Sequence, residues 1–412
     1  MRSATIAFAL ASATLSLGFN EQAPLTDPLK QAPILGSSSD APSYRRDLLK
    51  LHKSLISIPS VSGTEHDVGN FLIDYLKDLG YTTERQPIPP RNNTPKGQDR
   101  FNVLAFPPSK HHDPKVLVTS HIDVVPPHIP YGIEEGEVTD ETRIWGRGSV
   151  DAKASVAAQI TALEELLKED KVDASKLMLL FVVGEEVSGD GMKLFSNAIA
   201  EKQLPYKFDS VIFGEPTENK LACGHKGGLF CDVTAKGIPG HSGYPWVGKS
   251  ANELMIRAFA KILDTDLGSS DTYGNTTVNV GRFDGGVAAN VIPETAVVGM
   301  AVRVAIGPED LGATIVQDKI QDIFDEVDPG AFTMECTHGY GFVDCNCDVK
   351  DFETIVANYG TDIPNFKGDH TRYLYGPGTI LVAHGANENL TVADLETAVE
   401  GYQKLILHAL KQ

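Results

Sequence analysis

Positive charge is scarce in this chain of 412 residues, in which 36 Lys and Arg oppose 55 Asp and Glu for a net charge of -19. Such a surface repels a phosphate backbone, and no local basic patch compensates, so the sequence argues against a nucleic-acid partner. Beyond the N-terminus the chain also lacks an apolar run of the roughly 20 residues that a membrane helix needs. We therefore expect a soluble protein without nucleic-acid or membrane partners.

Cysteine is also sparse, and its spacing excludes the common zinc-binding and redox motifs. Neither a CxxC pair nor a Cys/His zinc spacing occurs among the five cysteines, Cys223, Cys231, Cys336, Cys345 and Cys347. Because five is odd, at least one thiol stays unpaired in an oxidised monomer. A disulfide from Cys336 to Cys345 or Cys347 is easy to imagine, and buried thiols without any bond fit the sequence equally well.

The N-terminal segment has the features of a secretory signal. Residues 1–18 contain one Arg and then a run of apolar and small residues, with a cleavage position after Gly18. Residues 19–43 are rich in Pro, Ser, Ala and Gln without periodicity, which is typical of a flexible lead-in or pro-segment. These features predict a secreted glycoprotein, whose glycosylation sequons are at Asn92, Asn275 and Asn389.

The rest of the chain is long enough for two domains, since single cores stop growing at about 250–300 residues. Apolar strand-like runs alternate with helical stretches such as 152–168 and 190–203, which indicates an α/β fold with a mainly parallel sheet. Between residues 229 and 343 the order changes to βαββαβ, a ferredoxin-like unit that we expect to be inserted as a lid. The catalytic domain would then consist of two segments, 44–228 and 344–412, on either side of a lid and dimerisation domain at 229–343.

Residues of metal-ligand type follow strand after strand in the α/β region. Parallel sheets bind their ligands beyond the carboxyl ends of the strands. The residues at these positions are His121, Asp151, Glu185, Glu186, Glu215 and His384. Each carboxylate alone is better explained as a solvated loop residue or a helix N-cap. Their repetition after several strands favours one shared metal site.

Charge balance supports a site for two divalent cations. Their positive charge is offset by three carboxylates, Asp151, Glu186 and Glu215, together with a bridging hydroxide. The neutral imidazoles of His121 and His384 complete a donor set that suits zinc, with cobalt or manganese as substitutes. We therefore expect two zinc ions per subunit.

Two further carboxylates have other expected roles. Glu185, next to the ligand Glu186, is the expected general base, which takes a proton from the metal-activated water and passes it to the leaving amine. Asp123 follows His121 by two residues, and its carboxylate is expected to accept the imidazole N–H and fix the orientation of that ligand.

In six stretches the chain resembles the dinuclear zinc amidohydrolases and exopeptidases, which include acetylornithine deacetylase, succinyl-diaminopimelate desuccinylase, aminoacylases and glutamate carboxypeptidase. The stretches, in chain order, are SHIDVVP, GRGSVDAKAS, GEEVSGDG, GEPTE, AKGIPGHSGYP and HGANE. The resemblance implies one zinc on His121 and Glu215, a second zinc on Glu186 and His384, and Asp151 as the bridge. It also implies Glu185 as the base, and a catalytic domain interrupted by a βαββαβ lid.

The resemblance implies substrate contacts as well. His241 of the GHS stretch would reach the reacting carbonyl oxygen, often from the partner subunit of a homodimer that the lids form. Asn290 and Arg303 would bind the substrate carboxylate, although the Asp that the family commonly has two residues before this Arg is Ala301 here. Further carboxylate contacts would come from the backbone N–H groups of the GPGT stretch, at Gly378 and Thr379.

Together these features predict a secreted, zinc-dependent, carboxypeptidase-like exopeptidase that hydrolyses the amide bond next to a free carboxylate. Its substrate would be a small peptide, since a secreted enzyme meets extracellular peptides first. One alternative is an N-acyl-amino-acid deacylase. The other is a non-catalytic binding protein, which Glu185 argues against because a protein that only binds has no use for a base.

Overall fold

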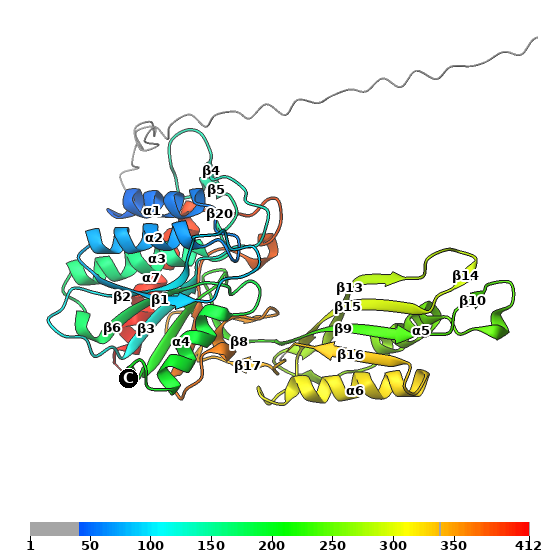
Figure 1. Ribbon diagram of the computed structural model, residues 1–412. Helices are drawn as coiled ribbons and strands as arrows, with labels where there is room; N and C mark the ends of the chain where they lie inside the picture. The colour runs from blue at the N-terminus through cyan, green and yellow to red at the C-terminus, as the bar shows by residue number, and fades with distance from the viewer. Residues whose placement is uncertain (1–40, 338, 412) are drawn as a thin grey trace, which may run out of the picture. The chain divides into compact units, whose positions relative to one another are not determined.

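The computed structural model describes residues 41–337 and 339–411, which Figure 1 draws as a coloured ribbon. The predicted signal segment 1–18 and nearly all of the predicted lead-in 19–43 lie outside these residues. Among the helices of the described residues, none has both the length and the apolar character that a membrane crossing requires.

The largest sheet of the described chain has nine strands. They are β1 (Thr82–Ile88), β2 (Arg100–Phe106), β3 (Val116–His121), β6 (Leu177–Val182), β7 (Ser210–Gly214), β8 (Leu221–His225), β17 (Val343–Asp344), β18 (Thr354–Ala357) and β19 (Thr371–Tyr375). The central strands lie in the order β6-β3-β7-β19 and are parallel. β1 and β2 on one side and β8 and β17 on the other are antiparallel additions, while β18 pairs in parallel with β8. The predicted α/β fold with a mainly parallel sheet is confirmed.

Helices cover both faces of this sheet. They are α1 (Arg45–Ser57), α2 (His66–Asp78), α3 (Lys153–Lys168), α4 (Asp190–Ala200) and α7 (Val392–Ala409). α3 packs on β3 and β7 and is itself covered by α1 and α7, whereas α2 packs on β1 and β2. In α3, the run of small and apolar residues ASVAAQITAL is buried throughout because this helix lies between the sheet and two outer helices. The predicted helices 152–168 and 190–203 correspond to α3 and α4.

The strands β3, β6 and β7 are mostly apolar because both of their faces are covered. Every residue of β3, β6 and β7 is buried. On one face, Met178 and Leu180 of β6 join a core cluster with Met192 and Phe195 of α4. The alternate residues of each strand point to the opposite face, where α3 packs. This packing fixes where each strand ends, and the candidate site lies at those ends.

A second sheet has four antiparallel strands in the order β13-β15-β9-β16. Its elements are β9 (Gly227–Lys236), α5 (Ala251–Asp264), β13 (Thr277–Gly285), β15 (Thr295–Val304), α6 (Gly312–Val327) and β16 (Phe332–Cys336). Burial alternates along β15, because one face of the sheet packs on α5 and α6 and the other face is open. These elements share a hydrophobic core of their own. The chain order βαββαβ is the one predicted, and we call this unit the lid.

Small sheets and single turns complete the described chain. One sheet has the order β20-β5-β4, and two more pair β10 with β14 and β11 with β12. Their strands are β4 (Gly132–Ile133), β5 (Arg143–Trp145), β10 (Gly240–His241), β11 (Ser269–Ser270), β12 (Gly274–Asn275), β14 (Val291–Ile292) and β20 (Asn389–Thr391). Single 3-10 turns are η2 (Ala174–Lys176), η3 (Pro245–Val247), η4 (Ile363–Asn365) and η5 (Ile380–Val382). The pairing of β5 with β20 joins two loops that carry predicted site residues.

Two disulfides form, and one cysteine stays free. Cys231 bonds Cys336, which lies opposite it in the register of β9 and β16. Cys223 of β8 bonds Cys347, and Cys345 is the free thiol. The bond that we imagined from Cys336 to Cys345 or Cys347 is therefore wrong, because strand pairing brings Cys336 to Cys231 instead. The expectation that at least one thiol stays unpaired is met.

Candidate metal centre

The predicted ligands come together at the carboxyl ends of the central parallel strands. His121 is the last residue of β3, and Glu215 directly follows β7. Asp151 lies two residues before α3, Glu186 follows β6, and His384 lies in the loop between η5 and β20. Because β3, β6 and β7 are neighbours in one parallel set, their ends meet at one edge of the sheet.

The first ligand group consists of His121, Asp151 and Glu215, whose ligand-type atoms lie within 4.8 Å of one another. His121 Nε2 is 3.0 Å from Asp151 Oδ1 and 3.8 Å from Glu215 Oε1. All three residues are buried, with exposed fractions of 2%, 6% and 6%. Solvation cannot account for this grouping, since almost no water reaches it.

The second group consists of Asp151, Glu186 and His384. His384 Nε2 is 3.0 Å from Glu186 Oε2 and 3.3 Å from Asp151 Oδ2. Asp151 therefore presents one carboxylate oxygen to each group, which is the geometry of a bridging ligand. His384 is the open side of the centre, because its side chain is 54% exposed.

The electrostatics of the centre fit bound cations. Burial raises the pKa of Glu215 well above its usual value, and that of Glu186 is raised by burial and by the neighbouring Asp151. Hydrogen bonds to Asp151 and Glu186 raise the pKa of His384 to about 10. Burial disfavours the charged form of His121, but Glu215 and Asp151 more than offset this effect and hold its pKa well above the usual range. Clustered buried carboxylates of this kind are stable as anions only beside positive charge, so the donor set fits two divalent metals.

Glu185 lies in the same turn as Glu186 but outside both ligand groups. The turn begins at Gly184, whose φ of +78° is left-handed. A Cβ at this position would lie 2.8 Å from Arg100 Nη2, so only glycine fits. Burial, and next the Glu215 carboxylate, raise the pKa of Glu185 well above its usual value. A carboxyl group with these properties is able to take up a proton and release it again.

Asp123 supports the turn after β6 more than it supports His121. Its Oδ1 accepts the Glu185 backbone N–H at 3.1 Å, and its Oδ2 accepts the Ser62 hydroxyl at 2.6 Å and the Glu186 N–H at 3.4 Å. His121 Nδ1 lies 2.9 Å from the main-chain oxygen of Asp123 but 3.7 Å from its carboxylate. The predicted carboxylate contact is thus replaced by a carbonyl contact, because backbone amides and Ser62 already occupy the carboxylate. The sequence analysis did not predict Ser62, because the residues around it form no motif that indicates a site.

Two predicted lid residues lie together, and no hydrogen bond joins either one to the ligand groups within the described chain. His241 ends β10, and its Nδ1 accepts the N–H of Gly243 at 3.0 Å. Asn290 directly precedes β14, and its carbonyl accepts the Ser242 N–H at 3.0 Å. The His241 ring is exposed and has an edge-to-face contact with Tyr244, with 5.6 Å between centroids. The pairing of β10 with β14 therefore places both residues on one tip of the lid.

Arg303, near the end of β15, is oriented by an aromatic ring. Its guanidinium carbon lies 5.6 Å from the centroid of Phe230, within the range of a cation–π contact. Phe230 is the register partner of Ala301, the position where the related enzymes commonly have Asp. The other side of the arginine approaches Gly360, since Nη1 lies 3.9 Å from the place of a Cβ there. On the side of Ala301, the neighbour of Arg303 is therefore the Phe230 ring, where the related enzymes commonly have an Asp carboxylate.

The GPGT stretch forms a loop after β19. Gly378 has a left-handed φ of +74°. Thr379 caps the η5 turn, as its Oγ1 accepts the Leu381 N–H at 3.3 Å, and the same hydroxyl donates to Glu218 Oε1 at 3.1 Å. This loop shares a backbone connection with the segment after β7, because Glu218 N–H donates to the Gly378 carbonyl at 2.8 Å.

Two further residues near Glu185 escaped prediction. The Tyr340 hydroxyl lies 2.3 Å from the place of a Cβ at Gly360, and its pKa is raised by burial and by Glu185. Asp362 is only 5% exposed, and burial raises its pKa to about 6. Its Oδ1 accepts the Asn365 amide at 2.7 Å. Neither residue lies in a motif that indicates chemistry, so only the folded chain reveals their position.

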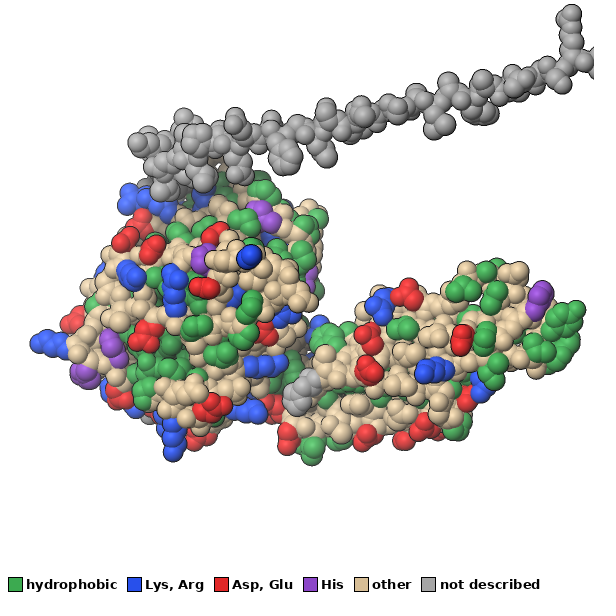
Figure 2. All heavy atoms as spheres, viewed as in Figure 1, with side chains coloured by type: hydrophobic (Ala, Val, Ile, Leu, Met, Phe, Trp, Pro, Cys, Tyr) green, Lys and Arg blue, Asp and Glu red, His purple; other side chains and the backbone are tan. Residues whose placement is uncertain are grey.

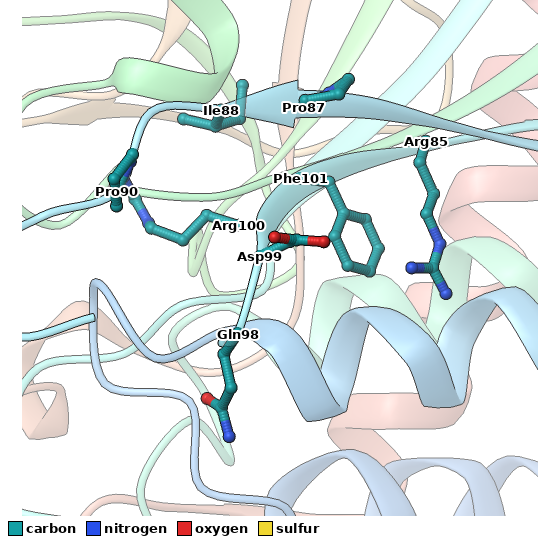
Figure 3. A pocket seen from close by; sticks show the side chains of 8 residues that line it. All are labelled: Arg85, Pro87, Ile88, Pro90, Gln98, Asp99, Arg100 and Phe101. Atoms are coloured by element: carbon teal, nitrogen blue, oxygen red, sulfur yellow. The ribbon is translucent and has the colours of Figure 1, made fainter. Parts of the chain in front are cut away.

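A pocket of about 170 Å³ lies beside β1 and the start of β2, and none of its lining residues is a predicted site residue (Figure 3). Its lining residues are Arg85, Pro87, Ile88, Pro90, Gln98, Asp99, Arg100 and Phe101. The guanidinium of Arg100 is bound by the buried carboxylate of Glu65 at 2.9 and 3.0 Å. Because Arg100 is already paired, the pocket offers no free charge for a ligand from that side.

Comparison with known proteins agrees with these features. Residues 223–341 match the model of the peptidase dimerisation domain. A peptidase M20 domain-containing protein of Sordaria macrospora is 58% identical, over 93% of this chain and 90% of its own length. A probable carboxypeptidase of Aspergillus oryzae is 44% identical, over 95% of this chain and 94% of its own length.

Solved structures share the fold at low sequence identity. A tripeptidase from Staphylococcus aureus has a TM-score of 0.72 at 20% identity, with 89% of this chain and 99% of that chain covered. An M20 family metallo-carboxypeptidase from Sulfolobus solfataricus has a TM-score of 0.68 at 16% identity, with coverage of 89% and 100%. The similarity thus extends over the α/β region and the lid together.

Proposed function

Because the chain belongs to the M20 peptidase family and is a metallo-exopeptidase, we propose that it is a secreted, zinc-dependent carboxypeptidase that hydrolyses the C-terminal amide bond of small peptides. The observation that carries the proposal is the pair of ligand groups that share Asp151. Glu185 lies next to these groups and belongs to neither. The expected alternative of a non-catalytic binding protein is ruled out by the family. The N-acyl-amino-acid deacylase remains the competing hypothesis for the substrate.

The donor set favours zinc. Two imidazoles and three carboxylates, His121, His384, Asp151, Glu186 and Glu215, are borderline-soft and hard donors that zinc accepts, with cobalt and manganese as substitutes. When bound, a pair of such ions polarises the scissile carbonyl and lowers the pKa of the attacking water. The residues supply the remaining functions, which are proton transfer and substrate orientation.

Proton transfer falls to Glu185. Its carboxylate is held at the centre by its own backbone N–H, which donates to Asp123. Burial and Glu215 raise its pKa, so the carboxylate takes a proton from water and, once protonated, gives it to the nitrogen of the leaving amino acid. Glu186 cannot share this role, because its Oε2 is 3.0 Å from His384 Nε2 within the second ligand group.

Substrate orientation falls to Arg303, helped by the backbone at Gly378 and Thr379. Asn290 lies with His241 beyond the opposite end of β15 from Arg303, so it would serve the site of a second copy of the chain. The guanidinium lies over the Phe230 ring and lacks the common Asp neighbour, whose position is Ala301. A free C-terminal carboxylate is the partner that this cation would select, since a neutral amide leaves the guanidinium desolvated and unpaired. This expected contact between Arg303 and the C-terminal carboxylate is the reason for proposing a carboxypeptidase.

The test compares one short peptide in three forms: with free ends, amidated at the C-terminus, and acetylated at the N-terminus. We expect cleavage of the free and acetylated forms, a loss of about 10²-fold or more for the amidated form, and no activity after chelation until zinc is restored. Cleavage of the amidated form with the acetylated one inert means an aminopeptidase. Strong preference for N-acyl amino acids over all peptides means the deacylase.

Secretion belongs to the same proposal. The signal segment 1–18 supports it, and two disulfides fit an oxidising compartment. Of the three sequons, Asn92 and Asn275 are exposed, whereas Asn389 is half-buried and donates to the Asn387 carbonyl at 2.6 Å. Protein recovered from the culture medium should therefore begin after residue 18 and carry glycans on Asn92 and Asn275. Protein that is found only inside the cell and still carries residues 1–18 would contradict the proposal of secretion.

A further inference from the structure

A buried ion pair lies directly behind the candidate metal centre. Arg147 follows β5 by two residues, and Glu388 immediately precedes β20. These strands pair, with Trp145 opposite Asn389, so the two charged residues meet although they are far apart in sequence. Arg147 Nη1 donates to Glu388 Oε2 at 2.7 Å, and their side chains are only 2% and 1% exposed.

The Glu388 carboxylate holds the backbone of the bridging ligand. Its Oε1 accepts the N–H groups of Val150 at 2.9 Å and of Asp151 at 3.1 Å. Its main-chain oxygen accepts the Ser149 hydroxyl at 3.1 Å. One residue thus fixes the chain that leads into Asp151, whose two carboxylate oxygens face the two ligand groups.

Arg147 reaches the other loop of the centre. Its Nη2 donates to the main-chain oxygen of His384 at 3.3 Å, and its Nε donates to the Pro127 carbonyl at 3.3 Å. Because Nη1 is bound to Glu388, one guanidinium connects the backbone of His384 to the group that holds Asp151. His384 has the most exposed side chain of the ligands, so its loop has the greatest need of such an anchor.

Stability alone does not explain this pair. Burying two charges carries a large desolvation cost, and apolar residues of similar size often serve a core equally well. What apolar residues cannot do is accept two backbone N–H groups and donate to a ligand's carbonyl at the same time. Within the described chain, the side-chain hydrogen bonds that the pair makes to other residues go to the two ligand loops or to the Pro127 carbonyl.

We propose that Arg147 and Glu388 are positioning residues that set the distance between Asp151 and His384 and thereby the affinity of the metal positions that these two ligands serve. The inference rests on the proposed two-metal function. Partners behind metal ligands typically change metal affinity by about 10–100-fold when they are removed. We therefore expect Arg147→Met and Glu388→Gln to weaken the binding of at least one ion by that factor.

The two variants should differ in which ion they affect. Arg147 contacts the loop of His384, so its loss should weaken mainly the ion held by Asp151, Glu186 and His384. Glu388 holds the backbone of the bridge, so its substitution should weaken both ions. Arg147→Lys keeps the buried charge but cannot donate to Glu388 and His384 with a rigid fork. It should show the selective loss in a milder form, and it carries the test if Arg147→Met does not fold.

The experiment titrates metal-free protein with zinc against a chromophoric chelator and obtains both dissociation constants, with His384→Ala identifying the second ion. The matched control is Arg45→Met, which removes a buried Arg with its partners Glu396 and Asp140, and no hydrogen bond of the described chain links this cluster to the ligand loops. Its melting temperature should fall while both constants stay unchanged. Wild-type constants in folded Arg147→Lys and Glu388→Gln proteins would overturn the inference. Absence of zinc binding by the wild-type protein would instead overturn the proposed function.

Discussion

Two neighbouring carboxylates, Glu185 and Glu186, leave one turn and meet different surroundings. Glu186 points to His384 and Asp151, whereas Glu185 lies outside both ligand groups. The backbone N–H groups of both residues donate to Asp123, which fixes how the turn presents them. Under the proposed function, this arrangement separates a ligand from a base at adjacent positions, which would explain why like charges are placed side by side.

The first prediction concerns this separation. Glu185→Gln should retain both metal ions and near-normal substrate binding while activity falls by about 10²–10⁴-fold. The reason is that a general base acts on proton transfer in the transition state and does not hold the ions. Metal content is measured on the purified variant by mass spectrometry, next to Glu186→Gln, which should lose metal. A Glu185→Gln protein that has lost zinc would make this residue a ligand.

A second prediction at this scale concerns acid stability. His52 is fully buried, its Nε2 bonds the Ser149 carbonyl, and burial lowers its pKa from 6.5 to about 4. Since the folded pKa is below the unfolded one, its contribution is fully present above pH 6.5 and is lost as the pH falls toward 4. At pH 5 the free energy of unfolding has fallen by about 2 kcal/mol relative to its value above pH 6.5.

The change that tests it is His52→Gln, which keeps a donor for the Ser149 carbonyl but does not titrate. Urea unfolding of metal-free protein at pH 7.5 and pH 5 should show a smaller acid-induced loss for the variant than for the wild type. The exposed His111→Gln serves as control and should leave the difference between the two pH values unchanged. Equal acid losses in His52→Gln and wild type would show that His52 does not govern this window.

At the scale of the elements, the site depends on where strands end and helices begin. β3, β6 and β7 end at one edge because they are parallel, and the pairing of β5 with β20 joins the loops of Asp151 and His384. α7 follows β20 directly and packs on α3. The start of α7 therefore holds both the outer layer of the core and the strand behind the metal centre.

That start has a capping box, which carries the third prediction. The Thr391 hydroxyl accepts the Asp394 N–H at 3.1 Å, and the Asp394 carboxylate accepts the Thr391 N–H at 2.9 Å. Thr391→Ala should lower the free energy of unfolding by about 1 kcal/mol, whereas Thr391→Ser should be nearly neutral because the hydroxyl remains. Urea denaturation of protein from a bacterial host, in which the Asn389 sequon is not used, measures both. Equal losses for the two variants would mean that the cap does not stabilise α7.

At the scale of the whole molecule, the lid has an apolar tip. Figure 2 shows hydrophobic side chains gathered at the end of the lid that carries β10 and β14. The exposed fractions are 54% for Ile238, 55% for Tyr244, 76% for Trp246 and 55% for Val247. Exposed apolar groups of this size commonly mark a contact with another protein surface. Since residues 223–341 match a dimerisation domain, a second copy of the chain is the expected partner.

The fourth prediction follows from a homodimer in which His241 serves the partner's site. Glu185→Gln and His241→Ala should each be inactive alone. Mixed at equal amounts and allowed to exchange subunits, they should regain about a quarter of wild-type activity, because half of the dimers are hybrids with one complete site each. Hybrid dimers that form but stay inactive would place His241 in the site of its own chain, whereas full activity of His241→Ala alone would place it outside catalysis.

Several features were readable in the sequence because they depend on local periodicity. The apolar runs within β3, β6 and β7 indicated strands covered on both faces, and the βαββαβ order of the lid followed from changes of period. TAVVGMAVRV coincides with β15 from Thr295 to Val304. Two ligand-type residues were readable for the same reason, since His121 ends β3 and Glu215 directly follows β7. His384 follows the η5 turn and Asp151 precedes α3, so their places were not given by strand ends. Their role as metal ligands stays a prediction that the proposed experiments test.

Other features depend on contacts between distant segments, and no local pattern encodes those. The antiparallel edges of the large sheet, the Cys231–Cys336 bond and the Phe230 ring beside Arg303 all arise from strand register. Arg147 and Glu388 stood within quoted motifs, yet their pairing needs β5 and β20 side by side. By itself the sequence determined which residues end the strands, because hydrophobic period is local. The tertiary structure decided which of those ends meet and what holds them, because burial and hydrogen bonding are settled only when distant segments pack.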